Sequence, residues 1–293
     1  MKLVCYRHGG RLHYGAVKGT RVIDLASRIG AAYPDIVSFI AHDGLPVARG
    51  IVERETGDFD YEALELAPVV PNPGKIVCVG LNYRDHIEEA ESKLGNLKNT
   101  ALPMIFARWP ESLAAHRQPI LRPKASHTLD WEAELLVVIG RDTGRYLPPE
   151  RALEHVFGYS CMNEACLREY QRHSSQIVPG KNFEQTGATG PWLVTADEIP
   201  DPMNLDIELR LNGEVMQKAN TRQMIQSVTA VIEYVSRWMP LKPGDLIATG
   251  TMGGVGFSRN PPVFMKPGDV AEVTIERIGT LRNPVEDEAH ARG

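Results

Sequence analysis

Three carboxylates alternate along the segment Thr128 to Gly140, TLDWEAELLVVIG. In a β-strand, residues two apart share a face, so Asp130, Glu132 and Glu134 would point the same way. Neighbouring carboxylates would then lie about 7 Å apart and repel by roughly 2–2.5 kcal/mol per pair at an effective dielectric of ~20. A divalent cation would turn this repulsion into attraction, because Mg²⁺ and Mn²⁺ prefer carboxylate oxygens. The alternative is a strand end that emerges into solvent, with arginines nearby to neutralise it.

His86 and Glu89 lie three residues apart in YRDHIEEAESKL, which has the pattern of a helix. They would therefore share a helix face and could form a hydrogen bond. A carboxylate that holds an imidazole fixes its tautomer and raises its basicity, which is how a water-activating general base is built. From the spacing alone, an acidic surface helix around an ordinary histidine is the favoured alternative.

Three further segments contain candidate polar groups. Glu164, in GYSCMNEACLREYQ, lies between two helical segments, and by itself it has the pattern of a solvated loop residue. Lys181 lies in the glycine-rich VPGKNFEQTGATGPW, where it could hold an anionic ligand or be exposed on the surface. The stretch ATGTMGGVG follows a strand, but FSRNPPVFMKPGD after it cannot form the helix that a nucleotide phosphate loop needs. A tight turn in which Thr251 faces a small anion fits better.

The composition is that of a soluble globular protein. The chain has 293 residues, 43% hydrophobic and 24% charged, with a net charge of −5. It has no basic excess for nucleic-acid binding and no apolar run near the ~20 residues that cross a bilayer. The start, MKLVCYRHGG, turns polar too soon for a signal peptide, so we expect a cytoplasmic protein. The four cysteines form neither a CxxC pair nor a zinc-ligand pattern, and we expect reduced, structural thiols.

The order of segments predicts two parts, residues 1–72 and 73–293, joined at the proline-rich APVVPNPGK. The first part has short strands, glycine turns and a helical stretch interrupted at Gly44. In the second part strands dominate after Asp130, and LKPGD and MKPGD are type II turns that each precede a strand. Only PPERALEHVFGYSCMN, ACLREYQRHSS and TRQMIQSVTAVIEYVSRWM have helical patterns there. This favours an α+β, mainly β fold over a doubly wound parallel sheet.

Taken together and in this order, seven segments resemble the fumarylacetoacetate hydrolase family over residues 75 to 279. They are KIVCVGLNYRDHIEE, PMIFARWPESL, LDWEAELLVVIG, GYSCMNEACLREYQ, GKNFEQTGATGPWLVTADEIP, LNGEVMQKANTRQMI and LKPGDLIATGTMGGVG. The resemblance implies a mixed β-sandwich or roll catalytic domain with a small N-terminal α/β accessory domain. It also implies a homodimer that acts on a small molecule.

The resemblance assigns a role to each candidate residue. Glu132, Glu134 and Glu164 match the ligands of a divalent cation, usually Mg²⁺ or Mn²⁺. His86 and Glu89 match a catalytic dyad, and Lys181 matches the family's active-site lysine. Gln171 and Thr251 match substrate-binding positions.

Three positions depart from the family pattern. Glu164 stands where members usually have aspartate, so its carboxylate must reach the metal from a more distant backbone or bind it differently. Glu184 also replaces an aspartate, and Arg108 stands where many relatives have lysine.

We expect a metal-dependent hydrolase that cleaves a C–C bond in a 2-oxo or 1,3-diketo acid, in aromatic or sugar-acid catabolism. Metal chelation of the 2-oxo acid, water activation by His86 and Glu89, and enolate stabilisation by Lys181 would provide the chemistry. The same enolate could lead to isomerisation, decarboxylation or hydration of a hydroxymuconate-type substrate. The alternative from another class is an inactive relative that only binds a small acid. We expect substrate selectivity to come from Asn96–Leu102 and Gln171–Val178.

Overall fold

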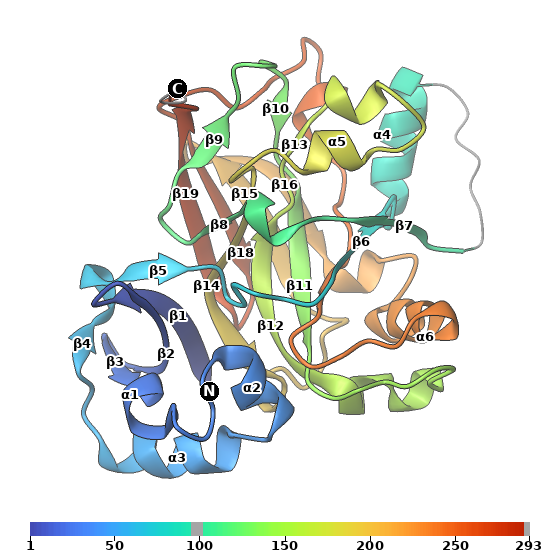
Figure 1. Cartoon of the computed structure of the whole chain (residues 1–293). Coiled ribbons are helices and arrows are strands. Elements are labelled where there is room, and N and C mark those ends of the chain that lie inside the picture. Colours follow the sequence, from blue (N-terminus) through green and yellow to red (C-terminus); the bar gives the residue numbers. More distant parts are fainter. Residues whose placement is uncertain (95–101, 290–293) are drawn as a thin grey trace.

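The computed structural model describes residues 1–94 and 102–289 of the chain as an α+β fold with two large β-sheets (Figure 1). Except for Leu102, the predicted selectivity segment Asn96–Leu102 lies outside the described residues. Most strand pairs are antiparallel, and within the described residues only β6–β17, β8–β14 and β9–β19 are parallel. The sequence therefore predicted the fold class correctly.

The larger sheet has the strand order β4-β3-β2-β1-β14-β12-β11-β17-β6-β7, with β5 paired to β1 and β8 paired to β14. Its N-terminal strands are β1 (Lys2–His8), β2 (Arg11–Lys18), β3 (Arg21–Asp24), β4 (Phe59–Asp60) and β5 (Glu65–Ala67). The others are β6 (Ile76–Gly80), β7 (Met104–Ala107), β8 (Leu113–Ala115), β11 (Ala133–Ile139), β12 (Val156–Asn163), β14 (Gly187–Thr195) and β17 (Leu246–Ala248).

The second sheet has the order β16-β15-β18-β19-β9, and a short pair, β10 with β13, lies beside the site described below. These strands are β9 (Ile120–Arg122), β10 (Leu129–Asp130), β13 (Cys166–Leu167), β15 (Asp206–Leu211), β16 (Glu214–Asn220), β18 (Val270–Ile275) and β19 (Gly279–Asp287). The helices are α1 (Leu25–Ile29), α2 (Ile36–Ala41), α3 (Leu45–Arg54), α4 (Arg84–Leu94), α5 (Val178–Lys181) and α6 (Val228–Trp238). No helix of the described residues is long and apolar enough to cross a membrane.

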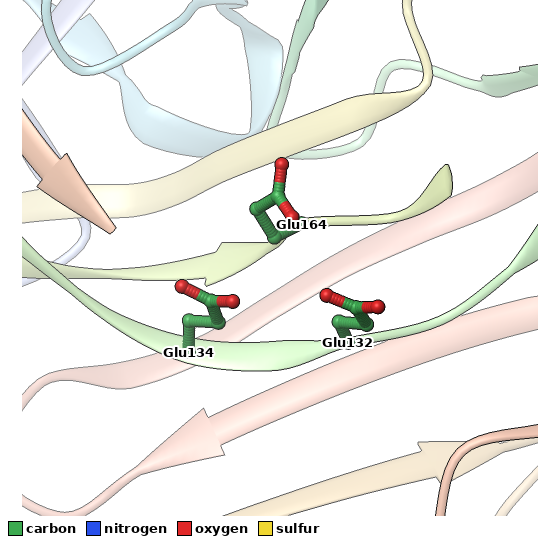
Figure 2. A group of neighbouring side chains, drawn as sticks. All are labelled: Glu132, Glu134 and Glu164. Carbon is green, nitrogen blue, oxygen red and sulfur yellow. The ribbon is translucent and has the colours of Figure 1, made fainter. Parts of the chain in front are cut away.

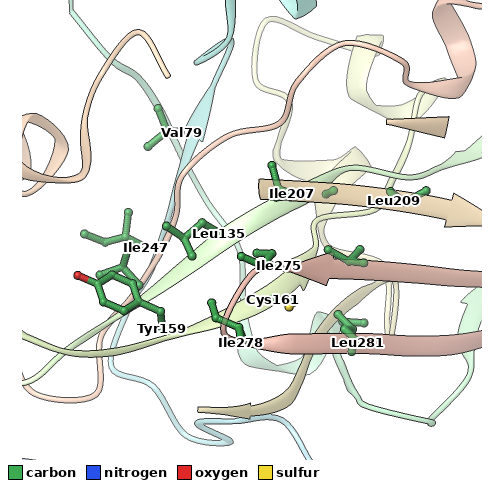
Figure 3. Packing of buried hydrophobic residues seen from close by; sticks show 14 of the residues in the cluster. Val79, Leu135, Tyr159, Cys161, Ile207, Leu209, Ile247, Ile275, Ile278 and Leu281 are labelled. Atoms are coloured by element: carbon green, nitrogen blue, oxygen red, sulfur yellow. The ribbon is translucent and has the colours of Figure 1, made fainter. Parts of the chain in front are cut away.

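The strand β11 lies between two hydrophobic clusters. Leu135, Val137 and Ile139 belong to the core shared with the second sheet, where they join Ile207 and Ile275 (Figure 3). Leu136 and Val138, on the other face of β11, belong to a different cluster, which includes residues from the helices of the N-terminal part. Each fully buried Leu, Ile or Val contributes roughly 1.5–3 kcal/mol. This two-sided burial explains the unbroken apolar run LLVVI and holds the segment before it in a fixed position.

The helical prediction for PPERALEHVFGYSCMN is wrong in its second half. Pro149–His155 forms a 3₁₀ helix, but Val156–Asn163 is strand β12, which pairs with β11 and β14. All eight residues of β12 are buried. A central strand covered on both faces shows no period-two alternation, so periodicity cannot separate it from a buried helix.

The two KPGD segments form the predicted turns. Gly244 has φ +83° and Gly268 has φ +90°, in the left-handed region that the third residue of a type II turn requires. In each turn the aspartate N–H donates to the lysine carbonyl at 3.0 Å, and strands β17 and β18 follow directly.

The proline-rich joint connects β5 to β6, but the larger sheet continues across the predicted boundary. Strand β1 pairs with β14 through Lys2–Val194 and Leu3–Leu193. The division at residue 72 therefore remains a prediction about folding units, within one continuous sheet. All four cysteines are buried and free, as expected for reduced thiols.

Candidate metal and substrate site

Three buried glutamates lie close together at the N-terminal end of β11. Glu132 immediately precedes β11, Glu134 is its second residue, and Glu164 follows the last residue of β12 (Figure 2). One carboxylate oxygen from each lies within 4.8 Å of the others, and the three side chains are at most 5% exposed. The alternatives of a strand end in solvent and of a solvated loop glutamate are therefore wrong.

The backbone is locally arranged to bring these carboxylates together. The Glu132 N–H donates to Asn163 Oδ1 at 3.0 Å, and the Glu164 N–H donates to the Glu132 carbonyl at 2.8 Å. Strand pairing stops at Trp131 and Glu132, so the single strand predicted over Thr128 to Gly140 is divided into β10 and β11. At this interruption the Glu132 carbonyl accepts from Glu164 instead of from a strand neighbour, which ties the backbones of the two residues together.

Asp130, the first carboxylate of the motif, has a different environment. Its oxygens accept hydrogen bonds from the backbone N–H groups of Gly256 and Phe257, at 2.7 and 3.0 Å. They also pair with Arg168 Nε at 2.7 Å. Asp130 therefore holds the backbone at Gly256 and Phe257 and the side chain of Arg168 in place.

Three buried cations surround the glutamates. Lys181 Nζ lies 2.7 Å from Glu132 Oε2 and also contacts the Glu164 carboxylate. Arg108 Nε lies 2.7 Å from the other oxygen of Glu164, and Arg168 Nη1 lies 2.6 Å from Glu132 Oε1. Lys181 is 1% exposed, so the alternative of a surface lysine is wrong.

Arg108 occupies a closely fitted space behind Glu164. Its Nη2 donates to the Ala165 carbonyl at 2.6 Å, and its Nη1 lies 3.3 Å from the hydroxyls of Ser112 and Thr186. A Cβ at Gly187 would lie 2.6 Å from Arg108 Nη1, so a residue without a side chain is needed beside the guanidinium. The two departures from the family pattern, Arg108 and Glu164, are thus direct partners.

The charges in this cluster do not balance. Four buried carboxylates face three buried cations, and Glu134 is the carboxylate without a cationic partner among the described residues. Its hydrogen bond comes from the Gly250 N–H at 2.8 Å. Burial, followed by repulsion from Glu164 and Glu132, raises the pKa of Glu134 well above its usual value. Burial also opposes the charge on Glu132, but Lys181 and Arg168 outweigh it and lower that pKa to about 2.

This donor set fits a divalent cation. Three carboxylates in a buried position are hard oxygen ligands of the kind that Mg²⁺ and Mn²⁺ select. A cation beside Glu134 would also compensate the one unmatched carboxylate of the cluster. Glu132, Glu134 and Glu164 are therefore the residues that could hold the metal.

His86 and Glu89 lie on helix α4 and face the same region. His86 is 6% exposed, which excludes the surface-helix alternative. Its Nδ1 lies 3.8 Å from Glu89 Oε2, longer than a hydrogen bond, while the other Glu89 oxygen accepts from the Gly254 N–H at 2.8 Å. Burial opposes the charge on Glu89, but His86 and the Gly254 N–H outweigh it and hold the pKa of Glu89 below its usual value.

A cavity of about 220 Å³ connects these groups. Its wall contains His86 from α4, the metal-ligand candidates Glu132 and Glu134, and Lys181. The remaining predicted site residues, Gln171 and Thr251, line it as well. Thr251 Oγ1 accepts from Gln217 Nε2 at 2.8 Å, and Gln171 Oε1 accepts from Arg168 Nη1 at 3.1 Å. The structure therefore brings all the predicted site residues into or beside one cavity, with Glu89 and Glu164 supporting its wall.

Sequence reasoning missed Arg168 and Gln217, which orient several of these side chains. Arg168 lies in a segment with a helical pattern, where an arginine predicts an exposed charge, but it is 4% exposed. Gln217 comes from β16, and its side chain accepts from the Ala133 N–H at 2.9 Å at the start of β11. No local signal identifies either residue, because both roles depend on contacts between distant segments.

Comparison with known proteins shows the family to which the chain belongs. The model of the fumarylacetoacetate (FAA) hydrolase C-terminal family matches residues 75–286. The chain belongs to the fumarylacetoacetate hydrolase family. The mitochondrial oxaloacetate tautomerase of Xenopus laevis is 41% identical over 248 residues, which cover 84% of this chain and 76% of that protein.

Two solved structures of the family share the whole fold. The fumarylacetoacetate hydrolase of Exiguobacterium antarcticum has a TM-score of 0.78 and 34% identity, covering 98% of this chain and 100% of that one. The maleylpyruvate hydrolase of Sphingobium sp. SYK-6, in complex with manganese(II) and pyruvate, has a TM-score of 0.81 and 29% identity. That match covers 99% of this chain and 100% of the hydrolase. The relatives of this chain thus include both tautomerases and hydrolases.

Proposed function

We propose that this protein is a Mg²⁺- or Mn²⁺-dependent enzyme that interconverts the keto and enol forms of a small 2-oxo acid such as oxaloacetate. The observation that carries the proposal is the cluster of three buried glutamates beside the Lys181 ammonium, of which Glu132, Glu134 and Lys181 line one small cavity. The similarity to oxaloacetate tautomerases supports the choice of reaction.

Glu132, Glu134 and Glu164 would hold the metal and leave open positions for the substrate's C1 carboxylate and C2 oxygen. When bound, the metal would supply Lewis-acid stabilisation of the negative charge that develops on the C2 oxygen.

Lys181 would add a second positive charge beside that oxygen. Burial opposes the charge on Lys181, but its anionic neighbours outweigh this effect and raise its pKa, so the ammonium stays protonated at neutral pH. Lys181 therefore suits electrostatic stabilisation and is a poor base. His86 lines the cavity and would carry the proton between the substrate's C3 and the solvent, with Glu89 orienting its ring, while the C2 oxygen exchanges its own proton with the solvent.

The size of the cavity favours a short substrate. Its volume of about 220 Å³ lies below the ~300–1,000 Å³ typical of sites for drug-sized ligands. A four-carbon acid therefore suits it better than a long diketo acid.

The C–C bond hydrolase predicted from the sequence is the second candidate. The pair of His86 and Glu89 favours it, because a base in this place could deprotonate a water that attacks the distal carbonyl of a 1,3-diketo acid. The C–C bond would then break, and the enolate released would take a proton from the solvent. The fold likeness to a maleylpyruvate hydrolase supports this candidate.

A product assay separates the two candidates. The Mn²⁺-loaded full chain is mixed with enol oxaloacetate, and loss of enol absorbance is followed against a chelator-treated control. In parallel, acylpyruvates are incubated and the released acids and CO₂ are measured. We expect metal-dependent ketonisation, abolished by chelator and restored by Mg²⁺ or Mn²⁺. Acid release from acylpyruvates without accelerated ketonisation would replace the tautomerase proposal with the hydrolase, and CO₂ release would indicate a decarboxylase.

A further inference from the structure

One wall of the cavity carries a cation that the chemistry above does not use. Arg172 lines the cavity, and its side chain is exposed. Across residues 1–94 and 102–289, its guanidinium has neither an acidic partner nor a side-chain hydrogen bond. The other cavity-lining cations, Arg168 and Lys181, are held by carboxylates. Arg172 is therefore available to an anion that enters from solvent.

The backbone at Arg172 is held in place although the side chain is free. A Cβ on Gly180 would lie 2.5 Å from the backbone nitrogen of Gln171, so α5 packs directly against this segment. The Arg172 N–H donates to the Glu169 carbonyl at 3.1 Å, and the ring of Tyr170 packs on Phe183 with centroids 4.9 Å apart. The guanidinium thus starts from a fixed point on the cavity wall and can turn toward a ligand.

The rest of the wall defines what a ligand could look like. Glu132, Glu134 and Lys181 contribute charged groups to the lining, and Met104, Phe106 and Ile177 contribute apolar side chains. A ligand that contacts these groups and Arg172 has a chelating 2-oxo acid group, a short carbon chain and a second anionic group. Arginine presents a planar fork of N–H donors that matches a carboxylate with two parallel hydrogen bonds.

We propose that Arg172 binds the distal carboxylate of the substrate, so that the site selects 2-oxo dicarboxylates over 2-oxo monocarboxylates. This inference rests on the proposed function and names the substrate class of that same site. Arg172 would act in binding: the metal and Lys181 stabilise the enolate, while Arg172 holds the far end of the molecule. Its removal should therefore raise KM more than it lowers kcat.

The test compares two substrates that differ only at the distal group, oxaloacetate and its 4-methyl ester. Both have the same enolisable carbon, but the ester has no distal charge. The variants are Arg172→Ala, Arg172→Lys, and Arg54→Ala as a control, because Arg54 is an exposed arginine in the last turn of α3. Ketonisation kinetics are measured with the Mn²⁺-loaded full chain.

For wild-type protein and for Arg54→Ala, we expect a lower KM for oxaloacetate than for its 4-methyl ester. In Arg172→Ala, the ratio of the ester KM to the oxaloacetate KM should fall about tenfold, because a charge-assisted pair has been lost. For Arg172→Lys, this ratio should lie between the values of wild type and Arg172→Ala, because lysine keeps the positive charge but lacks the planar fork of N–H donors. An unchanged ratio, or equal increases in both KM values, would overturn the role of Arg172.

A binding measurement separates this inference from the proposed reaction. Calorimetric titration of both compounds into the Mn²⁺-loaded protein reports the distal carboxylate even if nothing is turned over. Preferred binding of oxaloacetate that disappears in Arg172→Ala, without turnover, would support Arg172 and refute the tautomerase. Turnover with equal binding of both compounds in wild-type protein would support the tautomerase and refute the role of Arg172.

Discussion

The substitution Glu134→Gln should affect the metal-free and the metal-loaded protein in opposite directions. Without a metal, Glu134 is a buried carboxylate with two others within 4.8 Å. At an effective dielectric of ~20, a pair of charges at that distance repels by about 3.5 kcal/mol. The cations that pair with Glu132 and Glu164 cancel part of this, so we expect a net relief of about 1–2 kcal/mol from the neutral amide.

This relief depends on pH. The folded-state pKa of Glu134 is raised above its unfolded value of 4.5 by burial and by Glu164 and Glu132. The carboxylate therefore carries no penalty below pH 4.5, and the penalty becomes complete as the pH rises through the folded-state pKa. The advantage of the glutamine should appear at neutral and alkaline pH and disappear in acid.

Thermal unfolding in the presence of chelator measures the effect of Glu134→Gln on the stability of the metal-free protein. For a chain of this size, 1 kcal/mol corresponds to about 2–4 °C, so Glu134→Gln should raise the metal-free Tm by about 2–8 °C at pH 8. Glutamine can still accept the Gly250 N–H through its amide oxygen, so the local hydrogen bond is kept. The exposed Glu53 provides the matched control, and Glu53→Gln should leave Tm unchanged.

Titration with Mn²⁺ measures the effect of Glu134→Gln on the stabilisation of the protein by the metal. At a metal concentration of 100 times Kd, mass action stabilises the folded protein by about 2.7 kcal/mol, which corresponds to about 5–10 °C. Glu134→Gln should lose most of this increase if Glu134 is a ligand, because one of the three candidate ligand carboxylates is then gone. A lower metal-free Tm in the variant, or a Mn²⁺-induced shift equal to that of wild type, would refute the reasoning.

Two other substitutions test separate parts of the site. His86→Ala should lower kcat by about 10²–10⁴ while the Mn²⁺-induced Tm shift persists, because the role proposed for His86 is proton transfer and it is not one of the three candidate metal ligands; wild-type kcat would contradict this. Arg108→Gln should lower the free energy of unfolding by about 3–5 kcal/mol in urea titrations, since it removes the guanidinium 2.7 Å from the buried Glu164 and leaves Lys181 as the one cation paired with that carboxylate among the described residues. Lys75→Gln, which breaks the less buried pair with Asp245, should cost less, and equal losses would argue against the buried pair's importance.

Segments whose structure follows from local chemistry were predictable. The helix α4 follows from its periodicity, the strands β6, β7 and β11 from short apolar runs, and the two KPGD turns from the backbone preferences of proline and glycine. Strand β12 was not, because its residues show no alternation and directly follow a segment with a helical pattern, so the predicted helix was extended into it.

The candidate site was predictable as a set of residue types, but its geometry was not. Order along the chain and family resemblance identified Glu132, Glu134 and Glu164, yet the sequence left open whether the longer Glu164 could meet the other two. That answer depends on the interruption between β10 and β11 and on Arg108, 56 residues away in the chain. The unmatched charge of Glu134 likewise becomes visible only when the partners of every neighbouring side chain are known.

The pairing of β1 with β14 has a consequence for how the protein can be shortened. Strand β1 covers β14 at Leu193 and Val194, and Leu3 and Leu193 are both 1% exposed. Removing the first 72 residues would leave β14 with a bare hydrogen-bonding edge and uncovered leucine side chains, which is a template for pairing with another chain. In the full chain, the N-terminal part therefore covers this edge of β14. A protein without residues 1–72 should self-associate, as measured by light scattering, even though it retains every candidate site residue.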